Sequence, residues 1–463
     1  MPDTIAAIAT APAAAAVGIV RLSGVETRRV LAALFTPVNG RSAAELPPRR
    51  MTYGTVRDAE GRTLDHALAV VFSAGHSYTG EESAELHCHG SPVVLQEVLR
   101  AAFAAGARQA RAGEFTERAF LNGKMDLTEA EAVIDLIDAE TAEAARNAAA
   151  QVDGALRRPL EQVYDALLSL TSRFYAVVDY PDEDIEDLTL AETERTLTES
   201  EQTLAALLGT FARGRVLKSG AATAIVGAPN AGKSSLLNAL VGYDRAIVTD
   251  LPGTTRDTVE EKAVVGGVLL RLIDTAGLHE TDDLVEQLGV ERSKKAVEDA
   301  DLILALLDGS TGLPASEAWA AEMLAPLELA AKSGKPWLLL LTKSDLGGGA
   351  GIVPDKDWRT PEAIISLSSV THEGFEALEA AIRTLYPAPK GDTSLVTNAR
   401  QADAIRRALD SVRAAKDALQ SGMTPDVVLT EVEQAENALG ELTGRTARED
   451  MVARIFERFC VGK

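Results

Sequence analysis

The sequence predicts a multidomain protein that combines the α+β and α/β classes, with an α/β domain inserted into a helical domain. A chain of 463 residues exceeds what one hydrophobic core supports, so two or three domains are expected. From about residue 220, apolar strands alternate with helix-length segments, which predicts a mostly parallel sheet covered on both faces. Long amphipathic helices precede and follow this stretch, so the helical domain is divided in the sequence.

The composition is typical of a globular protein with an acidic surface. The chain has 46 Lys and Arg against 69 Asp and Glu, a formal charge of −23. Such a surface repels phosphate backbones, so an RNA substrate would require a local basic patch or a basic partner protein. The two cysteines cannot form a disulfide framework, and unpaired thiols are typical of a reducing cytoplasm. A cytoplasmic protein is therefore expected.

The uncharged, alanine-rich stretch 4–20 resembles a targeting segment only superficially. Asp3 stands where a positive n-region is expected, and Pro12 and Gly18 interrupt the run. We predict two short strands around a turn. No other segment approaches the length of a membrane span, so no membrane association is expected.

Residues 1–124 are predicted to form an N-terminal α+β domain. HALAVVF (66–72) is typical of a strand, and ESAELHCHG (82–90) of an alternating strand that ends at a glycine. A helix is predicted over 91–107, because serine followed by proline opens it and a glycine closes it.

Residues 125–219 are predicted to form the first part of the helical domain. Thr128 and Glu131 match the capping-box pattern at the start of its first helix. Apolar residues then recur at helical spacing over 160–178 and over about 190–212, which is typical of a bundle of long helices.

Residues 220–383 are predicted to form the inserted domain, and 384–463 the second part of the helical domain. The predicted strands of the inserted domain are AATAIVG (221–227), VLLRLID (268–274), DLILALLD (301–308), PWLLLLT (336–342) and EAIISLS (362–368). Helices return at 399–421, 425–440 and 446–458, and the last is opened by a second capping-box pattern, Thr446 with Glu449.

The first strand of the inserted domain leads into a phosphate loop. GAPNAGKSS (227–235) matches G-x-x-x-x-G-K-[ST] in the strand–loop–helix context that such a loop requires. Its glycines let backbone N–H groups surround the β-phosphate, while Lys233 reaches the β- and γ-phosphates and the Ser234 hydroxyl ligates Mg²⁺. The inserted domain is therefore predicted to be a Ras-like P-loop domain.

Further segments follow in the order that a GTPase requires. TDLPGTTRD (249–257) supplies Thr255 for Mg²⁺ and the γ-phosphate, and DTAG begins with Asp274 near the metal. TKSD contains Asp345, whose carboxylate can accept two hydrogen bonds from guanine N1–H and the 2-amino group and so selects GTP over ATP. Thr342 stands where this motif usually has asparagine, which leaves part of the tethering of the base loop open.

The predicted GTP-binding residues come from all these segments, including SLSS (366–369), which would support the base. They are Asn230, Ala231, Gly232, Lys233, Ser234, Ser235, Thr249, Asp250, Leu251, Pro252, Gly253, Thr254, Thr255, Asp274, Thr275, Ala276, Gly277, Thr342, Lys343, Ser344, Asp345, Ser368, Ser369 and Val370. Leu278 occupies the place of the glutamine that orients the attacking water in Ras-like enzymes, so another group must orient it here.

The chain resembles the MnmE (TrmE) family of tRNA-modification GTPases along essentially its whole length. The resemblance lies in NAGKSSLLNAL, TDLPGTTRD, SYTGEESAELHCHG, RAGEFTERAFLNGKMDLTEAEAVIDLI and the terminal CVGK. It implies a homodimer that works with a flavoprotein partner of the MnmG kind, which carries FAD. Together they would install an aminomethyl or carboxymethylaminomethyl group at carbon 5 of the wobble uridine of certain tRNAs, with the tRNA held mostly by the partner.

The resemblance also implies that the N-terminal domain binds a 5-formyl-tetrahydrofolate-type one-carbon donor. The matching residues are Arg21, Glu85, Lys124 and Lys463. Arg21 and Lys124 can pair with folate carboxylates, and Glu85 can accept hydrogen bonds from pterin N–H groups. Without the resemblance, a surface ion pair is the favoured interpretation of Arg21, Glu85 and Lys124 taken singly.

A K⁺ ion in place of an arginine finger is implied in the same way. Asn230, Thr249, Leu251 and Thr254 match the K⁺ ligands, and Ser234 and Thr255 the Mg²⁺ ligands. K⁺ would offset the charge that develops on the β–γ bridge. Glu286 matches the acidic residue that orients the water, while its other interpretation is a solvated helix carboxylate.

Cys460 lies in the terminal CVGK, which the resemblance places near the folate pocket. It could be a thiolate nucleophile near Lys463, a redox or folate-site group, or a packing residue. The HCH of 87–89 suggests a metal site, because His87 and His89 share one face of a strand, but no third ligand is evident.

Two other functions remain open. One is a ribosome-assembly GTPase, although that class usually carries a basic RNA-binding module such as a KH domain, and the sequence shows none. The other is a folate-dependent transferase in which the GTPase domain is only regulatory.

Overall fold

The computed structural model describes residues 3–179, 189–243, 261–273, 286–310, 317–347, 359–387, 395–446, 449–457 and 459–462. The chain divides into two compact units. The first unit comprises Met1–Ile134, Gln151–Leu204 and Asp403–Lys463, and the second comprises Asp135–Ala150 and Ala205–Ala402. The mixed α+β and α/β class is confirmed, while the four domain boundaries expected from the sequence stay a prediction.

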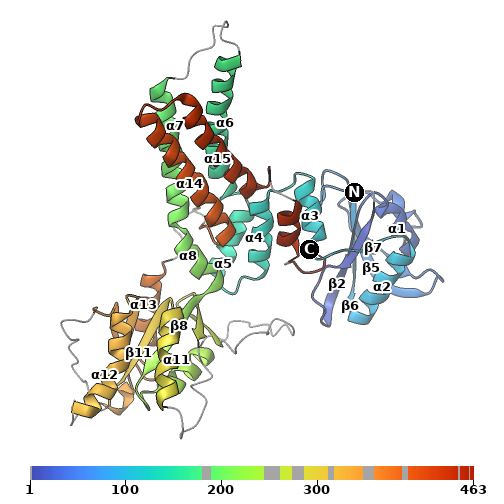
Figure 1. Ribbon diagram of the computed structural model, residues 1–463. Coiled ribbons are helices and arrows are strands. Elements are labelled where there is room, and N and C mark those ends of the chain that lie inside the picture. Colours follow the sequence, from blue (N-terminus) through green and yellow to red (C-terminus); the bar gives the residue numbers. More distant parts are fainter. Residues whose placement is uncertain are drawn as a thin grey trace. The chain divides into compact units, whose positions relative to one another are not determined.

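The first unit contains a seven-stranded sheet of order β3-β4-β5-β6-β2-β1-β7 (Figure 1). Its strands are β1 (Ile5–Ile8), β2 (Ala15–Ser23), β3 (Phe35–Pro37), β4 (Thr52–Arg57), β5 (Thr63–Phe72), β6 (Ser83–Gly90) and β7 (Arg108–Gln109). All neighbours pair antiparallel except β1 and β7. The strands expected at 66–72 and 82–90 are thus present, as are the two short strands of the alanine-rich start.

Two helices, α1 (Thr27–Leu34) and α2 (Pro92–Ala104), cover one face of this sheet. Val20 and Leu22 of β2 and Leu86 of β6 are fully buried against them. Side chains alternate across a strand, so Arg21 and Glu85 lie on the other face, where the two residues are register partners. The alternation expected for 82–90 therefore determines that Glu85, and not Leu86, lies on the face of the sheet where a polar site can form.

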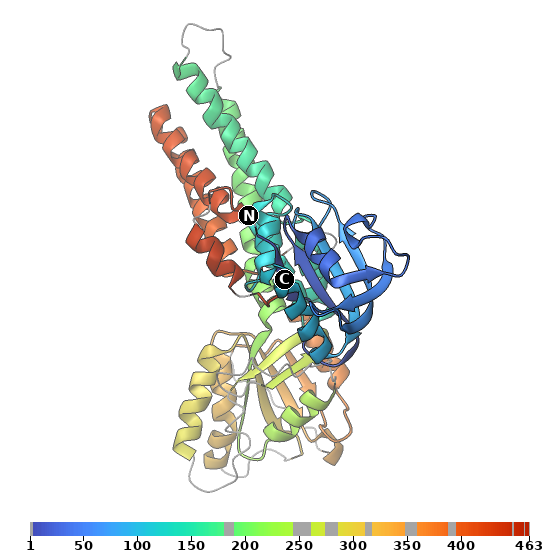
Figure 2. The same cartoon turned by 90° about the vertical axis from the view of Figure 1, so that its right-hand side faces the viewer.

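The long helices of the bundle run side by side (Figures 1 and 2). The helices that lie wholly or mainly in the first unit after its sheet are α3 (Glu114–Leu121), α4 (Leu127–Ile137), α6 (Arg157–Asp179), α7 (Leu190–Gly209), α14 (Ala399–Gln420), α15 (Pro425–Thr443) and α16 (Glu449–Phe456), whereas α5 (Ala142–Val152) and α8 (Phe211–Ser219) lie wholly or mainly in the second unit. Ion pairs from Glu201 of α7 to Arg413 and Lys416 of α14 tie two of them together.

The first capping box is not where the sequence pattern suggested. Thr128 lies inside α4, and the cap is Asp126, whose Oδ1 accepts a hydrogen bond from the Glu129 amide at 2.8 Å. Glu129 Oε2 in turn accepts from the Asp126 amide at 3.0 Å. Asp and Thr are comparable N-cap residues, so either pair could have capped the helix. The helix is capped by Asp126 with Glu129 and therefore begins at Leu127, two residues before the start that a Thr128 cap would give.

The second unit contains a six-stranded sheet of order β13-β12-β11-β8-β10-β9. Its strands are β8 (Ala221–Gly227), β9 (Glu261–Val265), β10 (Val268–Ile273), β11 (Leu302–Asp308), β12 (Trp337–Thr342) and β13 (Ala363–Ser366), and its helices are α9 (Lys233–Tyr243), α11 (Glu286–Asp299), α12 (Glu317–Lys332) and α13 (Phe375–Leu385). The five expected strands pair in parallel; β9 was not predicted and is an antiparallel edge strand on β10.

Separate apolar clusters cover the two faces of this sheet. One contains side chains of α9 and α13, and the other contains side chains of α11 and α12. Strands buried on both faces explain the continuous apolar runs seen in the sequence. Among the residues described, no helix is long and apolar enough to span a membrane.

Candidate functional site: a phosphate loop and a sheet-face cluster

The phosphate loop joins the end of β8 to the start of α9 in the second unit. Asn230 and Gly232 have φ of 61° and 91°, so the loop reverses through left-handed residues. A Cβ on Gly227 would lie 2.9 Å from the Leu306 carbonyl oxygen, so only glycine fits against β11. The curled loop exposes its backbone at the N-terminus of a helix, which is the arrangement that binds phosphate.

The lysine of the loop lies in a half-buried position. Lys233 Nζ donates to the carbonyls of Gly227 at 2.8 Å and Ala228 at 2.9 Å. Burial lowers the pKa of this ammonium group. An ammonium group binds charged phosphate oxygens more strongly than neutral carbonyls. Lys233 can therefore exchange its two carbonyl hydrogen bonds for bonds to phosphate oxygens.

Thr342 connects the end of β12 to the phosphate loop. Its buried hydroxyl lies 2.7 Å from the Ala231 carbonyl oxygen and 3.2 Å from that of Leu307. Thr342 therefore joins the base loop to the phosphate loop, although its side chain is shorter than the asparagine usual at this position.

The base loop is held by the residues around Asp345. Lys343, at φ 60°, forms an ion pair with Asp308 at 2.6 Å. Burial would raise the pKa of Asp308, but hydrogen bonds from Lys343 and Ser310 outweigh it and hold the pKa below its usual range. The Ser344 amide donates to Leu367, and Asp345 itself is exposed.

The loop after β13 lies beside this segment because β12 and β13 are parallel neighbours. Ser368 is buried, and its Oγ accepts hydrogen bonds from the amides of Val370 at 3.2 Å and Thr371 at 3.1 Å. Asn230–Ser235, Thr342–Asp345 and Ser368–Val370 therefore all lie at the carboxyl ends of β8, β12 and β13, the edge where α/β sheets bind ligands.

Other predicted nucleotide residues lie outside the described part of the chain. These are Thr249, Asp250, Leu251, Pro252, Gly253, Thr254, Thr255, Asp274, Thr275, Ala276 and Gly277. Glu286 is the first residue of α11, and its side chain is also outside the described residues.

The face of the first unit's sheet opposite α1 and α2 carries a polar cluster around Arg21. Arg21 Nε donates to Glu85 Oε1 at 2.9 Å, and His87 Nε2 lies 3.1 Å from Glu85 Oε2. The Arg21 guanidinium carbon lies 5.9 Å from the ring centre of Tyr78 and 5.7 Å from that of Phe115. From the sequence, Arg21 and Glu85 are expected to have different partners on a folate, whereas the structure pairs the two side chains with each other. The sequence provides no reason to expect the two rings.

Lys124 contacts the β5–β6 loop (residues 73–82). Its Nζ donates to the Gly75 carbonyl at 3.0 Å, and the neighbouring Asn122 donates to the Thr79 carbonyl at 2.7 Å. This loop also carries Tyr78, whose hydroxyl lies 2.9 Å from Thr116 Oγ1. The loop thus links Lys124 to the Arg21 cluster.

The C-terminal tail lies along the N-terminal part of the first unit. Phe459 is buried against Phe456, with ring centres 5.3 Å apart. The Gly113 amide donates to the Cys460 carbonyl at 3.4 Å, and Val461 forms an antiparallel bridge with Ala112.

The tail reaches the Arg21 cluster through its glycine. Arg21 Nη1 donates to the Gly462 carbonyl at 3.4 Å, so the guanidinium contacts both Glu85 and the tail. The Cys460 thiol is exposed, whereas Lys463 is outside the described residues. Residues 459–462 are a docked segment rather than a frayed end.

The HCH segment forms no metal centre within the part of the chain that the structure describes, where no group of three or more His, Cys, Asp or Glu could hold an ion. His87 and His89 share a face as expected, but His87 contacts Glu85 and His89 contacts Asp65. Cys88 points into the core, where burial raises its thiol pKa to about 12.

Comparison with known proteins identifies the family. A model of the MnmE helical domain matches residues 127–460, and a model of the GTP-binding protein TrmE N-terminus matches residues 4–124. The chain belongs to the MnmE family. It is 43% identical to the tRNA modification GTPase MnmE of Roseiflexus sp. (strain RS-1), over 100% of this chain and 99% of that protein. It is 41% identical to that of Heliobacterium modesticaldum (strain ATCC 51547 / Ice1), with the same coverage.

Proposed function

We propose that the protein is a K⁺-activated GTPase that modifies carbon 5 of the wobble uridine in certain tRNAs. Family membership and the geometry of the phosphate and base loops support GTP as substrate. Lys233 would neutralise the β- and γ-phosphates, Asp345 would recognise guanine, and Ser234 with Thr255 would hold Mg²⁺. Because Leu278 cannot orient water, Glu286 takes that role in the proposal, and Asn230, Thr249, Leu251 and Thr254 hold K⁺.

The observation that carries the rest of the proposal is the tail that docks against Arg21, whose guanidinium also pairs with Glu85. Folates have their pterin ring and their carboxylates at opposite ends. Arg21 and Glu85 are only 2.9 Å apart, so both would contact the same end of a bound 5-formyl-tetrahydrofolate. We therefore revise the expectation that Arg21 pairs with a folate carboxylate: we assign both residues to the pterin end, with Arg21 orienting Glu85, and leave the carboxylates to Lys124 and Lys463.

Cys460 lies on the docked tail as an exposed thiol, which fits a nucleophile or redox group better than a packing residue. The strongly acidic chain favours tRNA binding mainly through a flavoprotein partner of the MnmG kind, which would hold FAD. A homodimer and a cytoplasmic location complete the proposal.

Deleting residues 460–463 tests this division of roles. GTP turnover should remain near the wild-type rate, because the phosphate loop belongs to the other compact unit. Wobble-uridine modification, measured by mass spectrometry of tRNA from a complemented deletion strain, should be lost. Normal modification by the truncated protein would overturn the proposed role of the tail.

The variant Cys460→Ser then separates two roles of the thiol. A serine is nearly the same size but a far poorer nucleophile at neutral pH. Normal modification by Cys460→Ser would exclude a catalytic thiol.

A further inference from the structure

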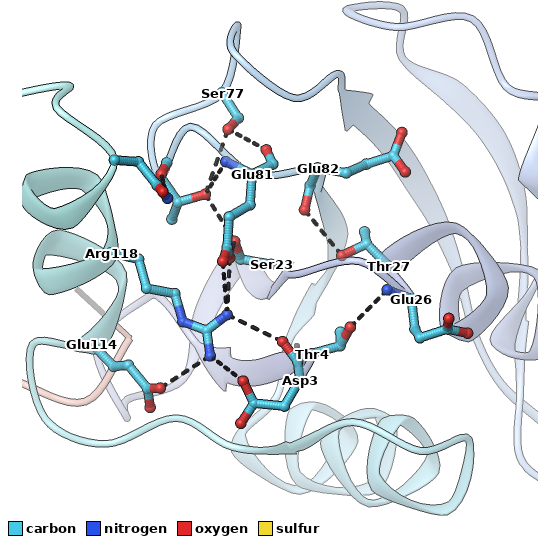
Figure 3. Close-up of polar contacts among 12 residues, drawn as sticks. Asp3, Thr4, Ser23, Glu26, Thr27, Ser77, Glu81, Glu82, Glu114 and Arg118 are labelled. Carbon is cyan, nitrogen blue, oxygen red and sulfur yellow. Dashed lines mark hydrogen bonds and ion pairs between the residues drawn. The ribbon is translucent and has the colours of Figure 1, made fainter. Parts of the chain in front are cut away.

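A buried arginine lies behind the proposed folate site. Arg118 on α3 is 1% exposed, and three acidic residues surround its guanidinium group (Figure 3). Its Nη atoms contact Glu81 at 2.9 Å, Asp3 Oδ1 at 2.8 Å and Glu114 Oε1 at 3.1 Å. One side chain thus joins the start of β1, the β5–β6 loop and α3.

The contact with Glu81 fixes the end of the β5–β6 loop. Ser23 Oγ donates to Glu81 Oε2 at 2.9 Å and lies 2.8 Å from Thr79 Oγ1. Ser77 and Thr79 are buried, the Ser77 hydroxyl lies 3.4 Å from Thr79 Oγ1 and it donates to the Glu81 carbonyl, so polar contacts hold the loop from inside. Such a loop keeps its shape only while its charged anchor is in place.

The same loop carries the groups that face the proposed ligand. Tyr78 lies beside Arg21 and is 39% exposed, so one part of its ring is open to a ligand. Gly75 receives the Lys124 ammonium. The position of the loop therefore determines where the Tyr78 ring and the Lys124 ammonium group lie. Arg118 itself is too deeply buried to touch a ligand.

We propose that Arg118 is a positioning residue for the folate site, which holds the β5–β6 loop so that Tyr78 and Lys124 line the pocket beside Arg21. This inference rests on the proposed folate function. It adds Tyr78 as an aromatic wall suited to the flat pterin or aminobenzoate ring.

The test uses the full chain and the double variant Arg118→Met with Glu81→Gln. Removing both charges avoids an isolated buried charge, whereas breaking a buried pair on one side is strongly destabilising. The double variant Arg100→Met with Glu97→Gln is the matched control, because it removes the same two charges from an exposed ion pair within α2 that does not contact the loop. If the Arg118 and Glu81 double variant does not fold, Glu81→Gln alone is measured in its place.

Two measurements are made on each protein. Hydrogen exchange of residues 73–82 should accelerate at least tenfold in the Arg118 and Glu81 double variant and remain unchanged in the Arg100 and Glu97 control. The dissociation constant for 5-formyl-tetrahydrofolate, measured by calorimetry, should rise at least tenfold in the Arg118 and Glu81 double variant only, while GTP turnover is unchanged in both.

Each other outcome is decisive. Unchanged loop exchange in the Arg118 and Glu81 double variant would overturn the role of Arg118 whatever the folate affinity is. Faster exchange with unchanged affinity would overturn the link between the loop and the site. If the wild type does not bind 5-formyl-tetrahydrofolate, the proposed folate function is wrong, and this inference fails with it. The exchange data still show separately whether Arg118 holds the loop.

Discussion

Replacing Gly462 with alanine should release the C-terminal tail. Gly462 has φ of 105°, a conformation that residues with a side chain rarely adopt. An alanine Cβ would also lie 2.3 Å from the Ile8 carbonyl oxygen, a backbone atom that cannot rotate away. Strain alone costs about 1–3 kcal/mol. The clash adds to this, so the equilibrium constant for docking of the tail should fall by roughly 10- to 100-fold.

Hydrogen exchange over residues 456–462 reports this release, because docking protects the bridge between Val461 and Ala112. The matched control is Gly61→Ala, which also has a positive φ, 79°, but meets nothing within 4 Å. Gly462→Ala should accelerate exchange in the tail and impair wobble-uridine modification, and the control should do neither. Exchange as slow as in the wild type would refute the view that the fit of Gly462 against Ile8 holds the tail.

Three further predictions follow from the two sites. Thr342→Val should weaken GDP binding, because loss of the hydroxyl contact to Ala231 costs about 1–3 kcal/mol. Thr342→Ser keeps the hydroxyl and should bind GDP as the wild type does. Equal affinities of the two variants would contradict a role for this contact. K⁺ should support much faster GTP turnover than Na⁺, and Asn230→Ala should remove that advantage but leave GDP binding largely intact; equal rates in the two salts would exclude a K⁺ site. Burial would raise the pKa of Glu114, but hydrogen bonds from Arg108, Arg111 and Arg118 lower it from 4.5 to about 2. It therefore stabilises the fold by on the order of 3 kcal/mol above pH 4.5, and this contribution is lost as the pH falls through that range toward 2. Glu114→Gln should accordingly flatten the loss of thermal stability below about pH 5, and a slope equal to that of the wild type would contradict this.

Periodicity was sufficient to predict most elements from the sequence. Strands such as 66–72 and 302–308 and helices such as α6 and α15 have strong apolar patterns, and the structure contains them. Patterns shorter than one helical turn were less reliable. Thr128 with Glu131 has the spacing of a capping box, but so does Asp126 with Glu129, and spacing alone does not choose between two overlapping pairs.

The candidate site was predictable where one short segment supplies the chemistry. The phosphate loop needs only glycines, a lysine and a serine in a fixed order, so its motif identified it. The Arg21 cluster combines β2, β6, the β5–β6 loop and the tail, which are up to 441 positions apart. No spacing rule predicts such contacts, and Tyr78, Phe115 and Arg118 were consequently missed.

The segment GEFTERA (113–119) contacts several other parts of the first unit. A Cβ on Gly113 would lie 2.6 Å from the Phe456 carbonyl, so the segment begins against the base of the tail. Glu114, Phe115 and Ala119 are fully buried, Arg118 is 1% exposed, and Thr116 contacts Tyr78. Nearly every position is therefore constrained by packing or by a hydrogen bond to a different element. A substitution in this helix would therefore disturb the tail, the β5–β6 loop or Arg21, so the packing of the helix supports the proposed folate site although only Phe115 of the helix lies beside Arg21.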